Sequence, residues 1–216
     1  MAPFHQFNES KALARVLDEL RGGKEIALVS DAGTPCINDP GLGLVQACIE
    51  ASLPFTAIPG PCSPIQALLL SGFDTAQFQF IGFLPRKGQK VLRKLLSYPG
   101  TTIGFESPER LVDTLEELHT LDPQRRVAVA REMTKTYEEC RRGTASELIA
   151  HFKEHRPKGE IVLLISGGKL PEEELSLDEL LELLQELHGI SLKEAIKLAA
   201  KLKHLPKSAV YKQAHS

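Results

Sequence analysis

The sequence predicts an α/β protein with two α/β domains and a small helical appendage at its C-terminus. Short apolar runs of strand length alternate with helical segments, as in a sheet with helices packed on it. Turns rich in glycine and proline follow the first two apolar runs. Beyond Gly167-Gly168 the apolar runs stop and only short helical patterns remain. The expected domains are therefore 1–76, 77–168 and 169–216.

The composition is that of a globular protein with a real core. Of the 216 residues, 42% are hydrophobic and 25% are charged, which is ordinary for a folded domain. No apolar run approaches the ~20 residues that cross a bilayer, and the N-terminus lacks the apolar core of a signal peptide. We therefore expect a cytoplasmic location and no membrane partner. The four cysteines form no CxxC pair, so no metal site is predicted.

In the first domain, the expected helices and strands alternate. Ser10 is the expected N-cap of the first helix and Gly22 its stop. Ser63-Pro64 is a typical helix start. The order matches a parallel sheet, in which loops after the carboxyl ends of strands bind ligands. The elements are a helix at 11–20, a strand at 25–30, a helix at 41–51, a strand at 55–59 and a helix from 63.

In the second domain and the tail, capping signals mark several helix starts. Ser107-Pro108 repeats the device of the first domain, and Thr144 with Glu147 and Ser191 with Glu194 form capping boxes. The expected strands are 78–85, 101–105, 126–130 and 160–166, with a polar loop after 130, and the expected helices are 88–97, one from 107, one from 144, 177–187, 191–202 and 206–214.

Four constellations could carry chemistry, of which the fourth, Lys158-Gly159-Glu160 ahead of the last expected strand, says almost nothing by itself. Residues 30–35 (SDAGTP) are either a tight turn or a loop that presents a hydroxyl and a carboxylate to a ligand. Residues 59–64 (PGPCSP) are either a stiff connector or a rigid turn that aims a helix N-terminus at a polar ligand group. Residues 130–138 (AREMTKTYE) are either a solvated loop or a set of groups for proton transfer. None is a GxGxxG or P-loop pattern.

Although the net charge is only −2, the charge is unevenly distributed. Residues 85–97 contain five basic side chains and no acid, residues 171–188 contain seven acids and no Lys or Arg, and residues 189–216 contain six lysines and one acid. Local basic patches attract a phosphate backbone whatever the total charge. Each basic stretch is either a solvated helix face or an RNA contact; the candidates are Arg86, Lys87, Lys90, Arg93, Lys94 and, in the tail, Lys193, Lys197, Lys201, Lys203, Lys207 and Lys212.

Six blocks, taken in order, resemble one family. The sequence resembles the ribosomal RNA small-subunit methyltransferase I group, a branch of the tetrapyrrole methylases, over nearly its whole length. The blocks are ALVSDAGTPCINDPG, IPGPCSPIQAL, GFLPRKG, FESPERL, VAREMTKTYEE with RGT, and KGEIVLLISG, and the tail ending KSAVYKQA fits as well.

The resemblance implies a two-domain class III methyltransferase fold that holds S-adenosyl-L-methionine. It implies methylation of the ribose 2′-hydroxyl of a cytidine in 16S rRNA of the small ribosomal subunit, by a protein that is often a homodimer. Glu132 matches the polar block as a candidate base, with Lys135 or Arg131 as its electrostatic partner. The implied cofactor contacts are Asp31, Ala32, Gly33, Thr34, Ile37, Cys62, Ser63, Glu106, Ser107 and Ala130.

The sequence departs from the family pattern at its start. Relatives carry a strand, a TPIGNLxDIT-type loop and an AEDTR block ahead of the first matched block. We therefore expect the first strand of the N-terminal domain to be missing, either because the sequence is a piece of a longer protein or because it is a short form. Two alternatives follow: a methylase of a small precursor of the same superfamily, or a truncated, non-catalytic binding protein.

Overall fold

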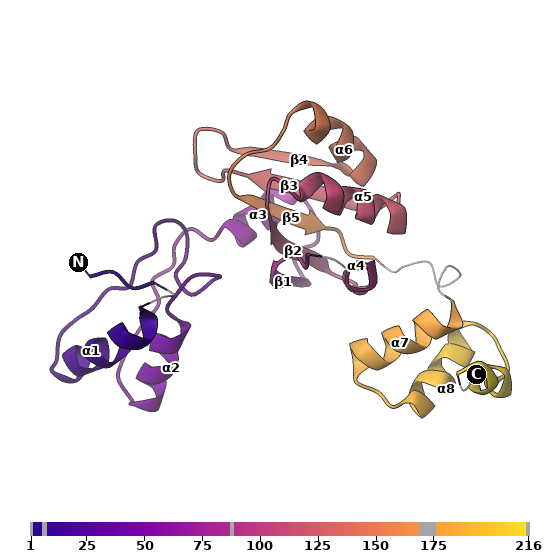
Figure 1. Cartoon of the computed structure of the whole chain (residues 1–216), viewed down its shortest axis with the longest axis horizontal. Coiled ribbons are helices and arrows are strands. Elements are labelled where there is room, and N and C mark those ends of the chain that lie inside the picture. The colour runs from indigo at the N-terminus through magenta and orange to yellow at the C-terminus, as the bar shows by residue number, and fades with distance from the viewer. Residues whose placement is uncertain (1, 6–7, 87–88, 169–175, 215–216) are drawn as a thin grey trace. The chain divides into compact units, whose positions relative to one another are not determined.

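The computed structural model describes residues 2–5, 8–86, 89–168 and 176–214, without the side chains at 10, 11, 89, 90, 187 and 188 (Figure 1). The chain divides into two compact units, Met1–Gln66 and Ala67–Ser216. The expected domain boundaries at residues 76 and 168 stay predictions. Among the described residues, no helix has the length and apolarity needed to span a bilayer.

The first unit is built on two helices, α1 (Glu9–Arg21) and α2 (Leu42–Glu50). They pack through Val16, Leu44 and Cys48. Asn8, and not Ser10, is the N-cap of α1, because its carbonyl accepts the first hydrogen bond of the helix, from the backbone N–H of Ala12. The prediction that Ser10 caps this helix is therefore wrong, since the cap lies two residues earlier. Gly22 ends α1 as expected.

The two strands expected in the first unit, 25–30 and 55–59, are wrong. Both segments are irregular, and within the described residues neither pairs with a strand. Their apolar side chains are correspondingly exposed, with Val29 at 69% and Ile58 at 87%. An apolar run signals a preference for burial, but a strand exists only where a neighbour takes up its backbone hydrogen bonds.

The second unit contains a five-stranded sheet in the order β1-β2-β5-β3-β4. Only β1 and β2 run parallel; the other neighbours are antiparallel. Four strands were predicted, and β4 was not, because ECRRGT has no apolar alternation. As an edge strand it pairs with β3 alone, so polar side chains are tolerated. The strands are β1 (Phe78–Phe83), β2 (Thr101–Glu106), β3 (Arg126–Arg131), β4 (Glu139–Thr144) and β5 (Ile161–Ile165).

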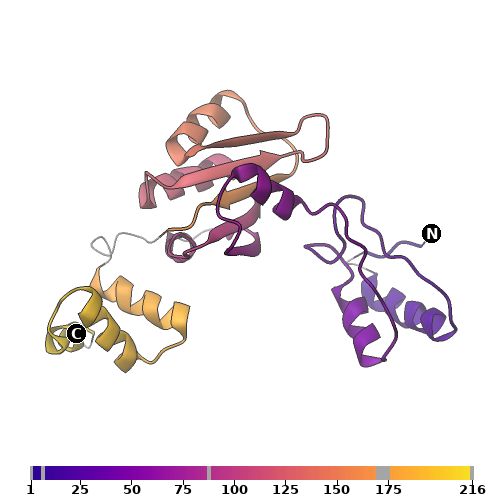
Figure 2. The same cartoon turned by 180° about the vertical axis from the view of Figure 1, so that it is seen from behind.

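Helices cover both faces of the sheet (Figures 1 and 2). On one face, α4 (Gln89–Leu96), α5 (Leu111–Leu121) and α6 (Ala145–Glu154) pack against alternate residues of β3 and β5. On the other, Ala67 and Leu68 of α3 (Ser63–Ser71) pack against the remaining alternate residues. Strand β5 is buried at every position, which explains its unbroken apolar sequence IVLLI.

The structure confirms one predicted helix start in the second unit and corrects another. The Thr144 and Glu147 capping box opens α6 with both reciprocal hydrogen bonds present. Ser107-Pro108 does not open α5, which begins at Leu111. Instead, the carbonyl of Ser107 accepts from the backbone N–H groups of Arg110 and Leu111. Residues 107–110 therefore form a turn ahead of the helix.

The tail contains α7 (Leu177–His188), α8 (Leu192–Leu202) and α9 (Lys207–Gln213), as the sequence predicted. Capping boxes begin α7 at Ser176 and α8 at Ser191. The three helices pack on one another. Their buried side chains include Leu180, Leu184, Ile196 and Val210.

We expect Thr144→Ala to lower the free energy of unfolding by about 0.5–2 kcal/mol, because it removes the side-chain cap of α6. Denaturant unfolding followed by circular dichroism measures this loss. Thr120→Ala is the matched control, since the Thr120 hydroxyl only donates to the carbonyl of Glu116 inside α5. Equal losses in the two variants would contradict the role of the cap.

Candidate functional site

The two Gly/Pro-rich turns of the first unit lie together. The hydroxyl of Thr34 donates to the carbonyl of Pro61 at 2.8 Å, across 27 positions of sequence. Gly33 has a φ of +77°, and a Cβ there would stand 3.8 Å from the same carbonyl oxygen. The Ser30 hydroxyl lies 3.2 and 3.0 Å from the carbonyl oxygens of Ala32 and Gly33. Residues 31–38 and 59–64 therefore form one surface.

The first turn is tightly folded. Cys36 and Asn38 adopt positive φ angles of 69° and 59°, a region that side chains enter only where the surroundings fix the backbone. At Gly41, a Cβ would approach Leu28 Cδ2 to 2.6 Å and Cys36 Sγ to 2.8 Å. Burial, helped by nearby Glu9 and Asp39, raises the pKa of the Cys36 thiol, so this group stays protonated at neutral pH.

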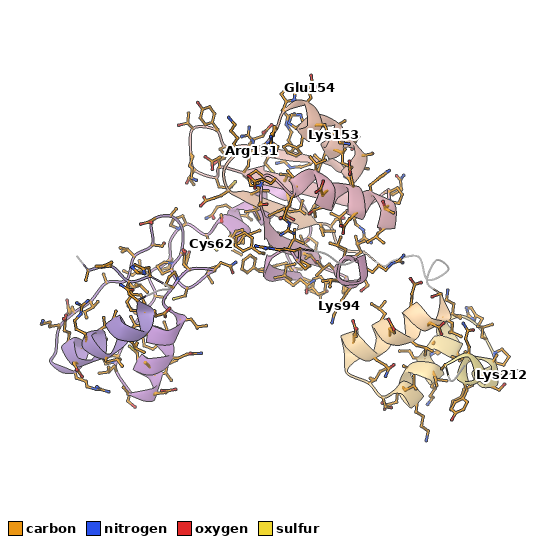
Figure 3. The ribbon with its side chains drawn as sticks, viewed as in Figure 1. Cys62, Lys94, Arg131, Lys153, Glu154 and Lys212 are labelled. Carbon is orange, nitrogen blue, oxygen red and sulfur yellow. The ribbon has the colours of Figure 1, made fainter. Side chains whose placement is uncertain are left out.

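The second turn leads into α3. The backbone N–H of Cys62, labelled in Figure 3, donates to the Gln66 side chain at 2.8 Å. The carbonyl of Cys62 accepts from the N–H groups of Ile65 and Gln66. Ser63 is the first residue of the helix, and both Cys62 and Ser63 are half-buried. Of the other residues predicted to touch a cofactor here, Asp31, Ala32, Gly33 and Ile37 are exposed and Thr34 is half-buried.

In the second unit, the polar loop after β3 surrounds one lysine with two carboxylates. The Lys135 ammonium lies 3.1 Å from Glu132 Oε1 and 2.9 Å from Glu160 Oε2. Glu132 Oε1 also accepts from the backbone N–H of Glu160 at 3.1 Å. Glu132 has a φ of +51°. A Cβ at Gly159 would overlap the Glu132 side chain, so a larger residue there would displace this carboxylate from its present position.

These contacts favour the charged form of each partner. The backbone hydrogen bond from Glu160, and then the bond from Lys135, hold the pKa of Glu132 below its usual range. Hydrogen bonds to Glu160 and Glu132 raise the pKa of Lys135. At neutral pH the loop therefore presents an ammonium group braced by carboxylates, and Glu132 takes up a proton less readily than an ordinary glutamate.

Arg131 is held at the end of β3. Its Nε lies 2.6 Å from Glu139 Oε2, and Arg141 Nε lies 2.6 Å from the other oxygen of the same carboxylate. Burial alone would raise the pKa of Glu139, but the hydrogen bonds from Arg141 and Arg131 outweigh it and lower this pKa. Arg131 (Figure 3) is half-buried and directly precedes Glu132 in the sequence.

Glu106 is buried and fully engaged. Its Oε1 accepts from the backbone N–H of Ser107 at 2.8 Å. Its Oε2 accepts from Arg110 at 3.1 Å and from the Thr114 hydroxyl at 2.6 Å. The side chain of Ala130 is likewise fully buried. The contacts with a cofactor that were expected for Glu106, Ser107 and Ala130 stay predictions.

The basic residues fall on separate surfaces. Arg86 is exposed, and Arg93 and Lys94 are half-buried on α4. Lys87 lies outside the described residues, as does the side chain of Lys90. Lys207 begins α9 and is exposed. On α8 the exposed lysines Lys193, Lys197 and Lys201 recur every fourth residue, opposite buried positions such as Ile196. Within the described chain, no group of three or more His, Cys, Asp or Glu side chains is placed to hold a metal ion.

The structure gives a definite place to two residues that the sequence marked only weakly, in the constellation Lys158-Gly159-Glu160. Gly159 and Glu160 complete the environment of Glu132 and Lys135. The only signal in the sequence is a glycine followed by an acid just before β5, which is weak because many strands begin in this way. The link between Thr34 and Pro61 also had no signal, since it joins distant turns.

Comparisons with known proteins point in one direction. The model of the family described as Tetrapyrrole (Corrin/Porphyrin) Methylases matches residues 2–149. A protein of Escherichia coli O157:H7 named "Ribosomal RNA small subunit methyltransferase I" is 42% identical over 97% of this chain and 76% of its own length. A protein of the same name from Halalkalibacterium halodurans is 39% identical over 100% of this chain and 78% of its own length.

Solved structures share the fold at low identity. Cobalt precorrin-4 methyltransferase matches with a TM-score of 0.54 and 16% identity, over 73% of this chain and 70% of that one. Uroporphyrin-III C-methyltransferase from Thermus thermophilus matches with a TM-score of 0.52 and 20% identity, over 73% and 71%. Together with the closer sequence relatives, these matches confirm the predicted fold class: the chain belongs to the tetrapyrrole methylase family, in its ribosomal RNA small-subunit methyltransferase I branch.

Proposed function

We propose that the chain transfers a methyl group from S-adenosyl-L-methionine to the 2′-hydroxyl of a cytidine ribose in 16S rRNA. The observation that carries this proposal is 42% identity, over 97% of the chain, to a relative named for methylating small-subunit ribosomal RNA. The solved tetrapyrrole methylases share the fold at 16–20% identity, which gives no support to a small precursor as substrate.

The joined turns of the first unit suit S-adenosyl-L-methionine, the cofactor of this family. The Thr34 hydrogen bond to Pro61 holds the two turns together, and Gly33 leaves the backbone open beside them. Asp31 offers a carboxylate and Ile37 an apolar surface, and both are exposed. When bound, the cofactor supplies an electrophilic methyl group. Cys62 and Ser63 would complete the contacts from the second turn.

The polar loop of the second unit provides groups for activating a hydroxyl. A ribose hydroxyl is a weak nucleophile until it loses its proton, so a base or a cation near the forming alkoxide helps the reaction. Lys135 is a cation held in place by two carboxylates. We assign it the electrostatic role, with Arg131 beside it. Glu132 is the proposed base, although its lowered pKa makes it the smaller contributor.

The basic surfaces would hold the RNA. Arg86 and the lysine stripe of α8 are exposed, and Lys207 and Lys212 (Figure 3) extend the charge onto α9. Phosphate contacts of this kind position the RNA without reading its sequence. A cytoplasmic location, where ribosomal subunits reside, and assembly as a homodimer are parts of the same proposal.

Lys135→Ala should lower the rate of methyl transfer to small ribosomal subunits roughly 100-fold or more, because removing one charge stabiliser of a transition state has effects of this size. The assay follows radiolabelled methyl groups from S-adenosyl-L-methionine. Lys153→Ala is the matched control, since Lys153 is exposed and paired with Glu116 at 2.7 Å. Equal rates in both variants would remove Lys135 from the mechanism.

Glu132→Gln separates the two roles of that carboxylate. If Glu132 only braces Lys135, the amide oxygen keeps hydrogen bonds to Lys135 and the N–H of Glu160, and we expect a loss below about 10-fold. If Glu132 is the main base, the loss should reach about 100-fold. The dependence of the rate on pH distinguishes the two, because only a base adds a titration to the profile.

Thr34→Val should weaken S-adenosyl-L-methionine binding roughly 2- to 12-fold, the equivalent of one net hydrogen bond of about 0.5–1.5 kcal/mol. The valine keeps the shape but cannot donate to Pro61. Thr34→Ser keeps the hydroxyl and should bind almost normally. Isothermal calorimetry measures both; identical affinities in the valine and serine variants would show that the two turns do not form the cofactor surface.

The double variant Lys197→Ala/Lys201→Ala should flatten the dependence of RNA binding on salt. Each lost phosphate contact changes the slope of log K against log salt by about 0.7–0.9, so we expect a change of roughly 1.5. Lys24→Ala/Lys153→Ala removes two exposed lysines elsewhere and should leave the slope unchanged. A slope that is the same in both double variants would exclude α8 from the RNA contact.

A further inference from the structure

An aromatic side chain stands exposed at the carboxyl end of β1. Phe83 is 62% exposed, and the centroid of its ring lies 5.6 Å from that of Phe105. Phe105 in turn meets Phe80 edge-on at 5.2 Å and 77°. Phe80 and Phe105 pack against the core that α3 covers. Phe83 is thus the outer member of an aromatic row whose inner members are fixed.

A bulge in β1 puts Phe83 in this row. Phe80 pairs with Ile103 and Phe83 pairs with Phe105, so β1 contains one residue more than β2 between these two pairs. Gly82, with a φ of +68°, lies inside this stretch. If the same residues ran in regular alternation, without a bulge, Phe83 would lie on the opposite face of the sheet, with Ile81. Bulges often re-aim a side chain beside a functional site.

The chain that follows Phe83 is clamped. Arg110 donates to the carbonyl of Leu84 at 3.1 Å and to that of Pro85 at 2.9 Å. Arg110 is itself held by the buried carboxylate of Glu106 at 3.1 Å. The exposed ring therefore sits on a backbone that is fixed on both sides, and ordering it on binding costs little entropy.

The segment of chain that follows Phe83 is basic. Arg86 is exposed three positions later, and residues 85–97 contain no acidic side chain. A rigid exposed aromatic ring next to cations is the combination that proteins use to hold unstacked bases of single-stranded RNA: the ring stacks on the base and the cation contacts the phosphate.

We propose that Phe83 is the stacking platform for one unstacked base of the RNA substrate. This inference rests on the proposed function and deepens it. It names a contact with the flat face of a base, whereas the lysines contact only phosphates. The base contributes its flat face, so the platform selects single-stranded RNA over a paired helix.

The test measures binding of a 16S rRNA fragment to the full chain. Phe83→Ala should weaken binding about 5- to 150-fold, the range for losing one base stack, with an unchanged salt slope. Arg86→Ala should instead reduce that slope by about 0.7–0.9. Phe83→Trp should bind like the unaltered chain. Phe78→Ala, at the other end of the same strand and 42% exposed, is the matched control and should bind normally.

Abasic substitutions then identify the stack. In the unaltered chain, removing one particular base should weaken binding several-fold, and in Phe83→Ala removing that base should have no further effect. Equal binding by Phe83→Ala and Phe78→Ala would overturn the proposal. So would a loss of S-adenosyl-L-methionine affinity in Phe83→Ala, because the ring would then serve the cofactor. If the unaltered chain binds no rRNA, the proposed function itself fails.

Discussion

The antiparallel pairing of β3 with β5 is the interaction on which the second unit depends. It sets Ala130 opposite Val162 and Arg131 opposite Ile161, and one step further the N–H of Glu132 reaches the carbonyl of Glu160. The carboxylates around Lys135 therefore come from two strand ends held in a single register. A slip of one residue would exchange the side chains of β5 between the two cores that cover the faces of the sheet, and it would separate these groups at the same time.

The sequence predicted strands well where burial and pairing coincide. The apolar runs of β2, β3 and β5 lie in the middle of a sheet, so their hydrophobicity reports both properties. The runs at 25–30 and 55–59 are equally apolar, yet within the described residues no strand pairs with them. Strand β4 shows the reverse: it pairs with β3 along six positions while its sequence ECRRGT carries no apolar signal. Hydropathy reports a preference for burial, whereas pairing depends on residues far away in the chain.

The candidate site was predictable in its pieces and not in its geometry. The glycines and prolines of residues 31–38 and 59–64 mark turns, but the hydrogen bond between Thr34 and Pro61 joins positions whose proximity only the folded chain defines. Likewise, the sequence marks Glu132 and Lys135 as candidates for catalysis because they share a polar loop. Glu160 completes the group because the register of β3 and β5 brings it beside Lys135. Gly159, next to it, leaves space for the Glu132 side chain. Glu106 was noticed as a ligand candidate, and the structure surrounds its carboxylate with donors from its own unit.

The bulge at Gly82 reverses the face of the sheet on which the later side chains of β1 lie. Phe83, which the alternation would send toward Ile81, faces the other way, while Leu84 takes the buried position instead and is only 3% exposed. The inside and outside of this strand end are thus fixed by a single inserted position. If the same residues ran through β1 in regular alternation, without the bulge, two of them would exchange roles: the leucine would meet solvent and the aromatic ring would enter the core.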